Sequence, residues 1–499
     1  MGEMLIKMKI EKISDSLFLF KDLCNVYVLK EKEEGISVDF GSGVFMKYLN
    51  EIGVKKITDV FITHPHLDHI CGLEKENSFR IHAPACSEKF ISPEGIEKYW
   101  GFLKKSVHGC PPNYSPIRKG IKNVLYDICE GNDIFWKNKR IRFIPTPGHT
   151  EFSYSVLLDI DGKQIVFCGD AFYINSKIFQ PYHLEWDHWT GKGVLSAWEG
   201  IIKLKNIKID VLCPGHGEVL KEDIKKHLEK LGKKLSHLYF SKGSICPGER
   251  DRYFQVEIVD EKIKKVIPSV YHFGENGYLI VSKNKECIII DPFSSDMVYL
   301  EKILKKFNFK PVIATSTHYH LDHIDGIDYL RKKYKTKLLL HPLVAEPLKI
   351  KKNERFPWLP LKEIKFDSLL PEHFKWNEYE FEIFHFPGQT WWSCGIFMTV
   401  DGFKALFSGD NFQPPSRWNG TGGFCAYNRS RFKEGFYKSA EKVIKLKPDL
   451  ILAGHGTFYY FNRTYFEKVK KWAIKTEKIV LSLCPDGDIE NNYYKIKYL

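Results

Sequence analysis

The chain lacks any apolar run near the roughly 18 residues that a membrane-spanning helix needs. Its beginning, residues 1–10, alternates apolar and lysine positions and has no long apolar core of the kind found in a signal peptide. We therefore expect a cytoplasmic protein that does not engage a membrane.

Closely spaced cysteine pairs are also absent. The 12 cysteines are scattered, and no two of them have the two-residue gap of a zinc ribbon or a redox motif. Several lie in apolar, strand-like runs, such as Cys168 in the run 165–168. We expect buried, reduced thiols and no disulfide framework.

A compact basic patch is missing as well, although the net charge is +13. The lysines are spread along expected helix faces, as in residues 221–234, and this spacing is typical of a solvated surface. Nucleic acid is therefore not the expected partner, and a small-molecule substrate is. At 499 residues the chain is too long for one hydrophobic core and should divide into domains.

A cluster of histidines and one aspartate is the most informative motif that is present. His64, His66, Asp68 and His69 directly follow the apolar run 57–63, which we expect to be a strand. Imidazole and carboxylate are ligands that a cation such as Zn²⁺ prefers. Gathering such groups away from water is costly unless something compensates them. The motif therefore predicts a metal site at the end of this strand.

The motif recurs later in the chain as His318, His320, Asp322 and His323. The motifs downstream also recur in the same order: residues 147–150 match 387–390, 167–170 match 407–410, and 214–217 match 453–456. A repeat of this length indicates a tandem domain duplication, because solenoid units are far shorter. We expect domains at 1–245 and 246–499, called here the first and second copy, with a linker at 241–252.

Further ligand-type residues stand at the ends of other expected strands. Alternate residues of an extended segment project the same way, so the histidine motif can serve two cations. The expected arrangement is one cation on His64, His66 and His149, a second on Asp68, His69 and His216, and Asp170 bridging both. Two such cations hold a hydroxide between them, and binding lowers the pKa of the parent water to about 7.

The second copy differs at one ligand. Its expected set is His318, His320, Asp322, His323, Gln389, Asp410 and His455. Gln389 stands where the first copy has His149, and a neutral amide oxygen is a weaker ligand than imidazole. His385 precedes Gln389 by four residues on an expected strand, too far to substitute, so we expect it to pack or to support. We expect one or two cations here, and the first copy as the active one.

The series His-x-His-x-Asp-His, Pro-Gly-His-Thr, Gly-Asp and Gly-His-Gly resembles the metallo-β-lactamase superfamily, and the resemblance covers nearly the whole chain, twice. It implies an α+β fold with two tandem αββα-sandwich domains, each with a dinuclear centre at one edge between its sheets. It also implies the ligand sets given above. Members of the superfamily mostly hydrolyse esters, thioesters, lactams, lactones or phosphodiesters.

The expected function is a hydrolase that uses a hydroxide bridging two metal ions on an ester-, thioester-, lactone- or phosphodiester-like substrate. Asp68 and Asp170 are the expected catalytic residues. We expect two divalent cations in the first copy, Zn²⁺ before Fe or Mn. The alternatives are an iron-dependent oxidoreductase acting on a thiol or persulfide, and a nuclease of the same superfamily. In a further alternative, the second copy is a scaffold that shapes a shared pocket or an intramolecular pseudo-dimer.

Each copy also has an aromatic-rich segment between its bridging aspartate and its last histidine, at 172–189 and 412–429. Such segments either line the pocket above the metal centre or cover a domain interface, and His183 and His188 are candidates for individual roles. Asn25 and Asn276 are expected to support the histidine loops through hydrogen bonds to the backbone.

Overall fold

The computed structural model describes residues 8–76, 78–105, 117–187, 190–243, 254–349, 358–413, 428–455 and 457–494. These residues form two compact units. The first unit lies within 1–104, 111–239 and Ile479–Lys495, and the second lies mainly within Phe240–Lys478. Residues 241–243 of the predicted linker instead end a helix, Ile224–Gly243, whereas the rest of the linker and the predicted boundary at 245/246 lie outside the described residues, so the boundary stays a prediction.

The first unit contains a seven-stranded sheet whose strands follow one another in chain order. They are β1 (Lys9–Lys12), β2 (Leu17–Lys21), β3 (Asn25–Glu31), β4 (Glu34–Val38), β5 (Lys56–Phe61), β6 (Arg80–Pro84) and β7 (Val124–Ile128). The strands β1 to β4 pair antiparallel, whereas β4 to β7 pair parallel. Because parallel strands end at the same edge of a sheet, the loops after β4 and β5 lie side by side.

A second, five-stranded sheet completes the sandwich. Its order is β12 (Val211–Pro214), β11 (Lys163–Gly169), β10 (Tyr154–Ile160), β9 (Lys139–Pro145) and β8 (Ile134–Trp136). One buried cluster joins the two sheets: the rings of Tyr27 and Phe167 lie 5.1 Å apart, and those of Phe61 and Phe143 lie 6.2 Å apart. The pairing of β11 with β12 is parallel, so the loops after these strands also share an edge.

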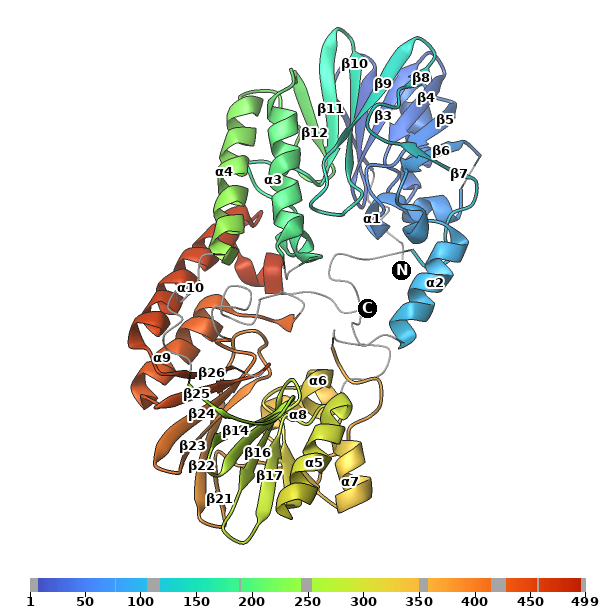
Figure 1. The fold of residues 1–499 in the computed structure, drawn as a ribbon. Helices are drawn as coiled ribbons and strands as arrows, with labels where there is room; N and C mark the ends of the chain where they lie inside the picture. The colour runs from blue at the N-terminus through green and yellow to red at the C-terminus, as the bar shows by residue number, and fades with distance from the viewer. Residues whose placement is uncertain are drawn as a thin grey trace, which may run out of the picture. The chain divides into compact units, whose positions relative to one another are not determined.

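Helices cover the outer faces of this sandwich (Figure 1). They are the 3-10 helix η1 (Val44–Ile52), α1 (Leu67–Ile70), α2 (Pro93–Lys105), α3 (Lys192–Lys205) and α4 (Ile224–Gly243). In the outer core of the first sheet, Phe45 of η1 packs on Phe20 with ring centroids 5.7 Å apart. On the other side, α3 lies against the end of β9, where a Cβ on Gly200 would come within 3.1 Å of Thr146.

The second unit repeats this plan. Its first sheet has eight strands in chain order: β13 (Glu257–Asp260), β14 (Ile263–Ile267), β15 (Val270–Phe273), β16 (Gly277–Val281), β17 (Glu286–Ile290), β18 (Lys310–Thr315), β19 (Lys337–Leu340) and β20 (Ser368–Leu369). Its second sheet has six strands, also in chain order: β21 (His373–Trp376), β22 (Tyr379–His385), β23 (Cys394–Val400), β24 (Phe403–Gly409), β25 (Leu450–Ala453) and β26 (Thr457–Tyr460). Its helices include α5 (Met297–Phe307), α6 (Leu321–Ile324), α7 (Ile327–Tyr334), α8 (Pro342–Ala345), α9 (Lys438–Leu446) and α10 (Arg463–Leu483). The predicted α+β class with two tandem sandwiches is confirmed.

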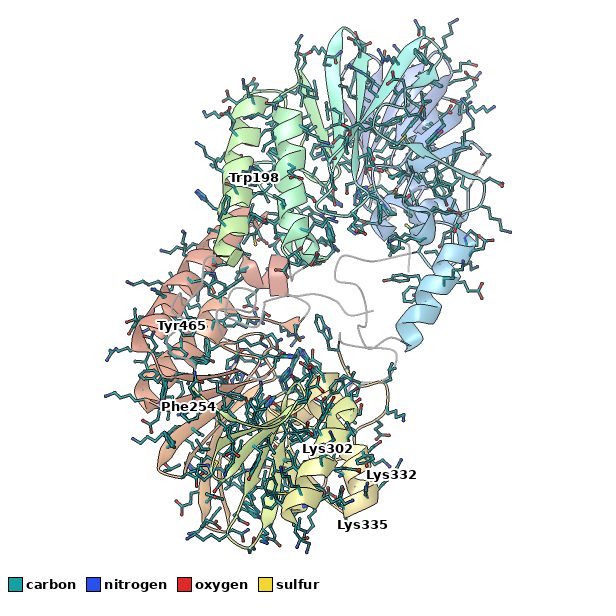
Figure 2. The ribbon with its side chains drawn as sticks, viewed as in Figure 1. Trp198, Phe254, Lys302, Lys332, Lys335 and Tyr465 are labelled. Atoms are coloured by element: carbon teal, nitrogen blue, oxygen red, sulfur yellow. The ribbon has the colours of Figure 1, made fainter. Side chains whose placement is uncertain are left out.

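The positions of the lysines and cysteines agree with the expectations of a solvated basic surface and of buried, reduced thiols. Lys302, Lys332 and Lys335 extend outward from the region of α5 and α7, and all three are exposed (Figure 2). The cysteines that the structure describes are free, and most of them are buried. Among the described helices, none combines the length and the apolar character that crossing a membrane requires.

One buried histidine of β15 should make the second unit sensitive to acid. His272 is 1% exposed, its Nε2 donates to the Glu275 carbonyl at 3.2 Å, and burial, helped by Lys264, lowers its pKa to about 3. An imidazole in the unfolded chain titrates near pH 6.5, so between these values the unfolded state binds more protons and stability falls as the pH falls. We expect this residue to lower the free energy of unfolding by about 2 kcal/mol between pH 7 and pH 5. Urea titrations at both pH values should show His272→Gln losing that part of the pH dependence; an identical pH dependence in the variant would contradict the assignment.

Candidate metal centre

Four loops at one edge of the first sandwich bring the predicted ligands of the first copy together. The histidine motif follows β5 and begins α1, and the other three loops follow β9, β11 and β12. They carry, in chain order, His64, His66, Asp68 and His69, then His149, then Asp170, and then His216. These seven side chains are called here the first centre. The parallel pairs β4–β5 and β11–β12 place the loops at a common edge.

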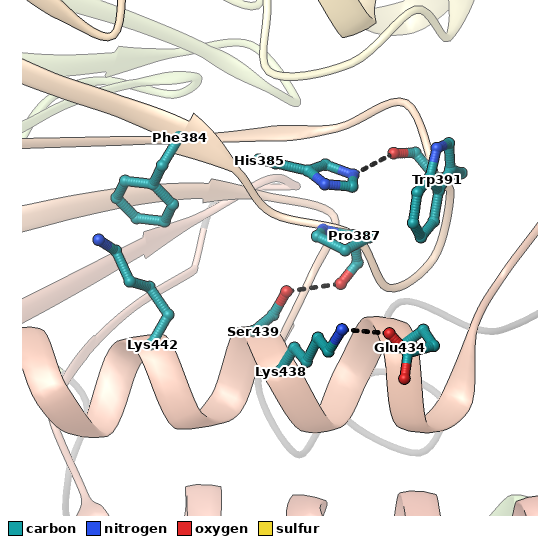
Figure 3. A pocket seen from close by; sticks show the side chains of 8 residues that line it. All are labelled: Phe384, His385, Pro387, Trp391, Glu434, Lys438, Ser439 and Lys442. Atoms are coloured by element: carbon teal, nitrogen blue, oxygen red, sulfur yellow. Dashed lines mark hydrogen bonds and ion pairs between the residues drawn. The ribbon is translucent and has the colours of Figure 1, made fainter.

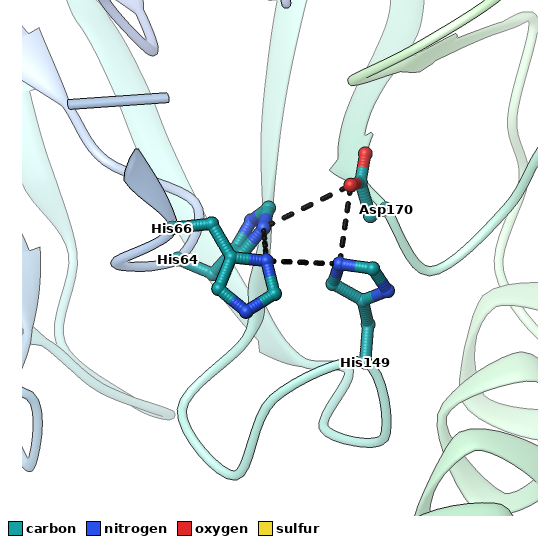
Figure 4. Close-up of side chains that lie close together, drawn as sticks. All are labelled: His64, His66, His149 and Asp170. Carbon is teal, nitrogen blue, oxygen red and sulfur yellow. Dashed lines mark hydrogen bonds and ion pairs between the residues drawn. The ribbon is translucent and has the colours of Figure 1, made fainter. Parts of the chain in front are cut away.

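One half of the first centre consists of His64, His66, His149 and Asp170, all of them buried (Figure 4). The Nδ1 atom of His66 lies 3.2 Å from Nε2 of His64 and 3.0 Å from Nε2 of His149. The Nε2 atom of His149 lies 3.2 Å from Oδ2 of Asp170. Three imidazole nitrogens that face one another with a carboxylate oxygen form a donor set typical of a divalent cation.

The other half consists of Asp68, His69 and His216. The Oδ2 atom of Asp68 lies 3.0 Å from Nε2 of His216 and 3.9 Å from Nε2 of His69. The Oδ2 atom of Asp170 lies 3.7 Å from Nε2 of His69 and 3.6 Å from Nε2 of His216. Asp170 is therefore within 4 Å of nitrogens from both halves, which is where a shared ligand has to lie.

The hydrogen bonding of the first centre leaves a gap that cations fit. Within the described part of the chain, both carboxylate oxygens of Asp170 and Nε2 of His69 are buried without a hydrogen-bond partner. An ionised carboxylate that is removed from water without a partner is strongly destabilising. Divalent cations on these atoms satisfy them, so the residues present fit such ions.

The protonation states agree with this role. Burial, together with the neighbouring imidazoles, holds the pKa of His64 and of His149 well below the usual value for histidine. Burial by itself would raise the pKa of Asp68, but His69 and His216 hold it below its usual value. His64 and His149 are therefore neutral and Asp68 is ionised, which are the forms that bind a metal ion, whereas the pKa of His69 is raised, so that His69 gives up a proton when it binds a cation.

Two residues to which the sequence analysis gave no role orient the histidines. Asp39 follows β4, and its Oδ2 accepts a hydrogen bond of 2.8 Å from Nδ1 of His69. Its Oδ1 accepts from the backbone N–H of Thr63 at 2.8 Å, and the Thr63 hydroxyl lies 3.1 Å from Nδ1 of His64. Asp39 adopts a left-handed backbone, with φ 59°, and its counterpart Asp291 does so with φ 55°. The sequence signal for this role was that an aspartate recurs at the corresponding position of both copies, as Asp39 and Asp291.

Replacing Asp39 by asparagine should weaken cation binding. The change keeps the size of the side chain but removes the charge that fixes the His69 ring, and losses of such supporting groups typically weaken metal affinity 10- to 100-fold. Competition against a chromophoric chelator would measure the affinity. Asp59→Asn is the matched control, because Asp59 pairs with His82 and Arg80 and lies outside the first centre. An unchanged affinity in Asp39→Asn would show that Asp39 does not position His69.

Aromatic and imidazole rings from the segment after Asp170 lie on the first centre. The ring of Phe179 stacks on His216 at 3.7 Å, and the ring of His183 lies 4.5 Å from His66 and 4.7 Å from His149. Asp68, whose side chain is 35% exposed, is the most accessible of the proposed ligands. These contacts place the segment against the proposed ligands, and its role in lining a pocket stays a prediction. His188 and Trp189 lie outside the described residues.

The second copy brings its predicted ligands together less completely. His318, His323 and Asp410 form one group, and Asp322, His323 and His455 form another. Gln389 lies beside them, with its Nε2 donating to Oδ2 of Asp410 at 2.8 Å, the position that His149 takes towards Asp170. His320 places its Nε2 3.1 Å from the Asn428 side-chain oxygen and belongs to neither group. A carboxylate only accepts hydrogen bonds, so the amide nitrogen faces Asp410. Most of the segment 412–429 lies outside the described residues.

A cavity of about 360 Å³ lies in the second unit, between the end of β22 and α9 (Figure 3). His385 is part of its wall, as are Trp391 and residues of α9. The Nε2 atom of His385 donates to the Trp391 carbonyl at 2.8 Å, and the two rings meet edge to face at 4.6 Å. These contacts agree with the packing role that was predicted for His385.

Both asparagines support the loop that carries the last histidine of their copy, since the Asn276 side-chain oxygen accepts a hydrogen bond from the backbone N–H of His455 at 3.2 Å. Asn276 donates to the Asp322 carbonyl at 2.8 Å, and so supports the histidine loop of the second copy as predicted. Asn25 instead donates to the Pro214 and Gly217 carbonyls, both at 2.9 Å. The prediction for Asn25 was therefore wrong, because this side chain fixes the loop that carries His216.

Comparison with known proteins places these motifs in a family. The family model of the metallo-beta-lactamase superfamily matches residues 19–216 and 270–455. A hydroxyacylglutathione hydrolase from Wigglesworthia glossinidia brevipalpis is 27% identical over 195 residues, covering 36% of this chain and 62% of that protein. Another, from Buchnera aphidicola subsp. Baizongia pistaciae (strain Bp), is 39% identical over 82 residues, or 16% of this chain and 32% of that protein. The chain thus spans less than two thirds of either relative.

Among solved structures, a mutant metallo-beta-lactamase from Cronobacter sakazakii is similar, with 14% identity and a TM-score of 0.35. The match covers 46% of this chain and 95% of the solved one.

Proposed function

We propose that this chain, which belongs to the metallo-beta-lactamase superfamily, is a metal-dependent hydrolase that works at the first centre. The observation that carries the proposal is the convergence of seven ligand-type side chains from four loops, with Asp170 within 4 Å of nitrogens from both halves. In this proposal residues 1–245 form the catalytic domain, and residues 246–499 form a second domain with an altered site.

In the proposed centre, one cation is held by His64, His66 and His149, a second by Asp68, His69 and His216, and both by Asp170. Zn²⁺ is the proposed ion, since imidazole and carboxylate together suit it. When bound, the cations would supply Lewis acidity and would lower the pKa of a water molecule to about 7, so that it could act as the nucleophile.

The protein's own groups supply the rest of the mechanism. Asp68 is the accessible carboxylate of the first centre, so it is placed to orient the attacking water and to accept its proton at Oδ1, since Oδ2 contacts His216. His64 and His149 are buried, which keeps water away from the inner side of the centre. Phe179 and His183 border it, and we propose that the substrate binds between them and Asp68.

An ester-like bond is the proposed target, and a thioester is the first candidate. Both curated relatives are named for hydrolysis of a hydroxyacylglutathione, which is a thioester. A hydrolase of this kind needs a small-molecule substrate and no macromolecular partner. Lactones and phosphodiesters have the same requirement for an activated water and a stabilised oxyanion, so they remain within the proposal.

The decisive experiment is a substrate screen with the intact chain. Protein loaded with Zn²⁺ would be assayed against an S-acylglutathione thioester, an acyl lactone and an activated phosphodiester. We expect turnover of at least one class, a fall of at least about 100-fold after chelation, and recovery on adding Zn²⁺ back, because the nucleophile depends on the cations. No hydrolysis by the loaded protein, or oxygen uptake with a thiol in its place, would overturn the proposal.

We further propose that the second copy binds cations more weakly than the first. Gln389 donates a hydrogen bond to the Asp410 oxygen that a cation would otherwise use. It also replaces an imidazole by a neutral amide, which is a weaker ligand. Turnover is therefore assigned to the first centre alone.

A further inference from the structure

The segment 173–186, called here the aromatic loop, reaches from one half of the first centre to the other. At one end the Tyr173 ring lies against Gly217, next to His216, so closely that a Cβ on Gly217 would come within 2.8 Å of it. At the other end Trp186 Nε1 donates to the Gly148 carbonyl at 3.0 Å, next to His149. The aromatic loop therefore contacts both the loop that carries His149 and the loop that carries His216.

The local conformation of the aromatic loop is not one that its sequence favours. Asn175, Ser176 and Gln180 have left-handed backbones, with φ of 63°, 59° and 47°. Asparagine tolerates this region, but it is unfavourable for serine and glutamine, so a surrounding structure has to hold Ser176 and Gln180 there. The hydrogen bond of the Ser176 hydroxyl with His227 of α4, at 3.1 Å, supplies part of that support.

The end of the chain supplies another part. Residues Ile479–Lys495 belong to the first unit, although the chain traverses the second unit before reaching them. The backbone N–H of Ile178 donates to the Leu483 carbonyl at 3.0 Å, and Nζ of Lys177 donates to the Pro485 carbonyl at 2.7 Å. Ile178 is 1% exposed, so its amide contact is shielded from water.

Lys234 of α4 joins the same two segments. Its Nζ donates to the Ser176 carbonyl at 2.5 Å and to the Ser482 carbonyl at 2.8 Å. A single ammonium group thus satisfies one carbonyl of the aromatic loop and one of the terminal segment. Hydrogen bonds from a charged donor are stronger than those between neutral groups, which makes this contact a substantial one.

We propose that the terminal segment 482–485 positions the aromatic loop over the first centre, through Lys177, Ile178 and Lys234. The end of the chain is then part of the substrate-binding apparatus of the N-terminal copy. Lys177 and Lys234 are positioning residues that touch neither the cations nor the substrate. The effect on substrate binding rests on the proposed function, whereas the effect on the loop itself does not.

Hydrogen exchange tests the loop directly in the full chain. Lys234→Met should speed amide exchange across residues 176–183 by about 10-fold or more, because it removes the shared donor and leaves two carbonyls unpaired. Lys233→Met is the matched control, since Lys233 is the exposed neighbour on α4 and should leave exchange unchanged. Lys234→Arg should restore most of the protection, because guanidinium also donates to both carbonyls.

Kinetics test the consequence. In Lys234→Met, KM for the substrate identified by screening should rise about 10-fold, while kcat and the bound Zn²⁺ stay within about 3-fold of the parent, since the loop contributes binding contacts only. Lys177→Met, which removes only the contact with Pro485, should give a smaller change in the same direction. This variant replaces Lys234→Met in both measurements if Lys234→Met does not fold. Unchanged exchange in both variants overturns the proposal whether or not any substrate is found. A fall in bound Zn²⁺ together with kcat would also overturn it, because the lysine would then support the metal centre itself.

Discussion

Replacing Asp170 by alanine is expected to lower kcat/KM by about 1000-fold or more and to release cations from the first centre. Its Oδ2 atom lies within 4 Å of four imidazole nitrogens, those of His64, His69, His149 and His216. No other carboxylate among the described residues reaches both halves of the centre. Its removal would take away the ligand that both cations share and the negative charge that offsets their repulsion. The activated water would then be lost.

Asp410→Ala is the matched control, because Asp410 follows β24 as Asp170 follows β11 and forms the corresponding contacts in the second copy. Zinc analysis and initial-rate kinetics would be run on both variants, with circular dichroism to establish that each has folded. We expect Asp410→Ala to retain at least about a third of the parent activity, since turnover is assigned to the first centre. Retained activity in Asp170→Ala, or a collapse in Asp410→Ala, would contradict that assignment.

Adding a single methyl group at Gly215 is expected to have a comparable effect. A Cβ at this position would lie 2.5 Å from Oδ1 of Asp170 and 2.7 Å from Cε1 of His69. The loop cannot easily move aside, because the Gly215 N–H donates to the Gly169 carbonyl at 2.7 Å and the Gly215 carbonyl accepts from Asn25 at 2.7 Å. Gly215→Ala should therefore displace the two ligands, weaken cation binding at least about 100-fold and lower kcat/KM to match.

The second copy offers the control here as well. A Cβ on Gly454 would lie 2.5 Å from Oδ1 of Asp410, so Gly454→Ala imposes the same collision on the other centre. Its expected effect is a loss of cations from the second copy with activity within about 3-fold of the parent. Normal Zn²⁺ binding in Gly215→Ala would show that the loop carrying His216 yields, and that the close approach of backbone to ligands is not required.

The ligand sets of both copies were accessible from the sequence because their chemistry is concentrated in short motifs. His64, His66, Asp68 and His69 lie within six positions, and each remaining ligand follows an apolar run and adjoins a glycine. The duplication strengthened this prediction, because the same motifs are unlikely to occur twice in the same order by chance. The structure brings the first set together, so that each of the seven side chains has a ligand atom within 4 Å of a ligand atom of another.

Other features of the site had no local signature. Asp39 contacts His69 only because β4 and β5 run parallel and end together. The wrong assignment for Asn25 has a related cause. Nothing in the sequence around Asn25 indicates that the loop after β12 lies next to it in the folded chain. Such contacts depend on sheet pairing between distant segments, which residue patterns along the chain do not encode directly.

The sequence by itself determined the fold class, the duplication, the types of ligand and the single substitution at Gln389, because ligand chemistry and strand-ending loops are local properties. Only the tertiary structure decided that Gln389 binds Asp410, that Phe179 and His183 lie on the ligand rings, and that Leu483 and Pro485 hold the aromatic loop. These facts arise from hydrogen bonds and ring contacts between segments far apart in the chain, and such contacts form only once the strands have paired and the cores have closed.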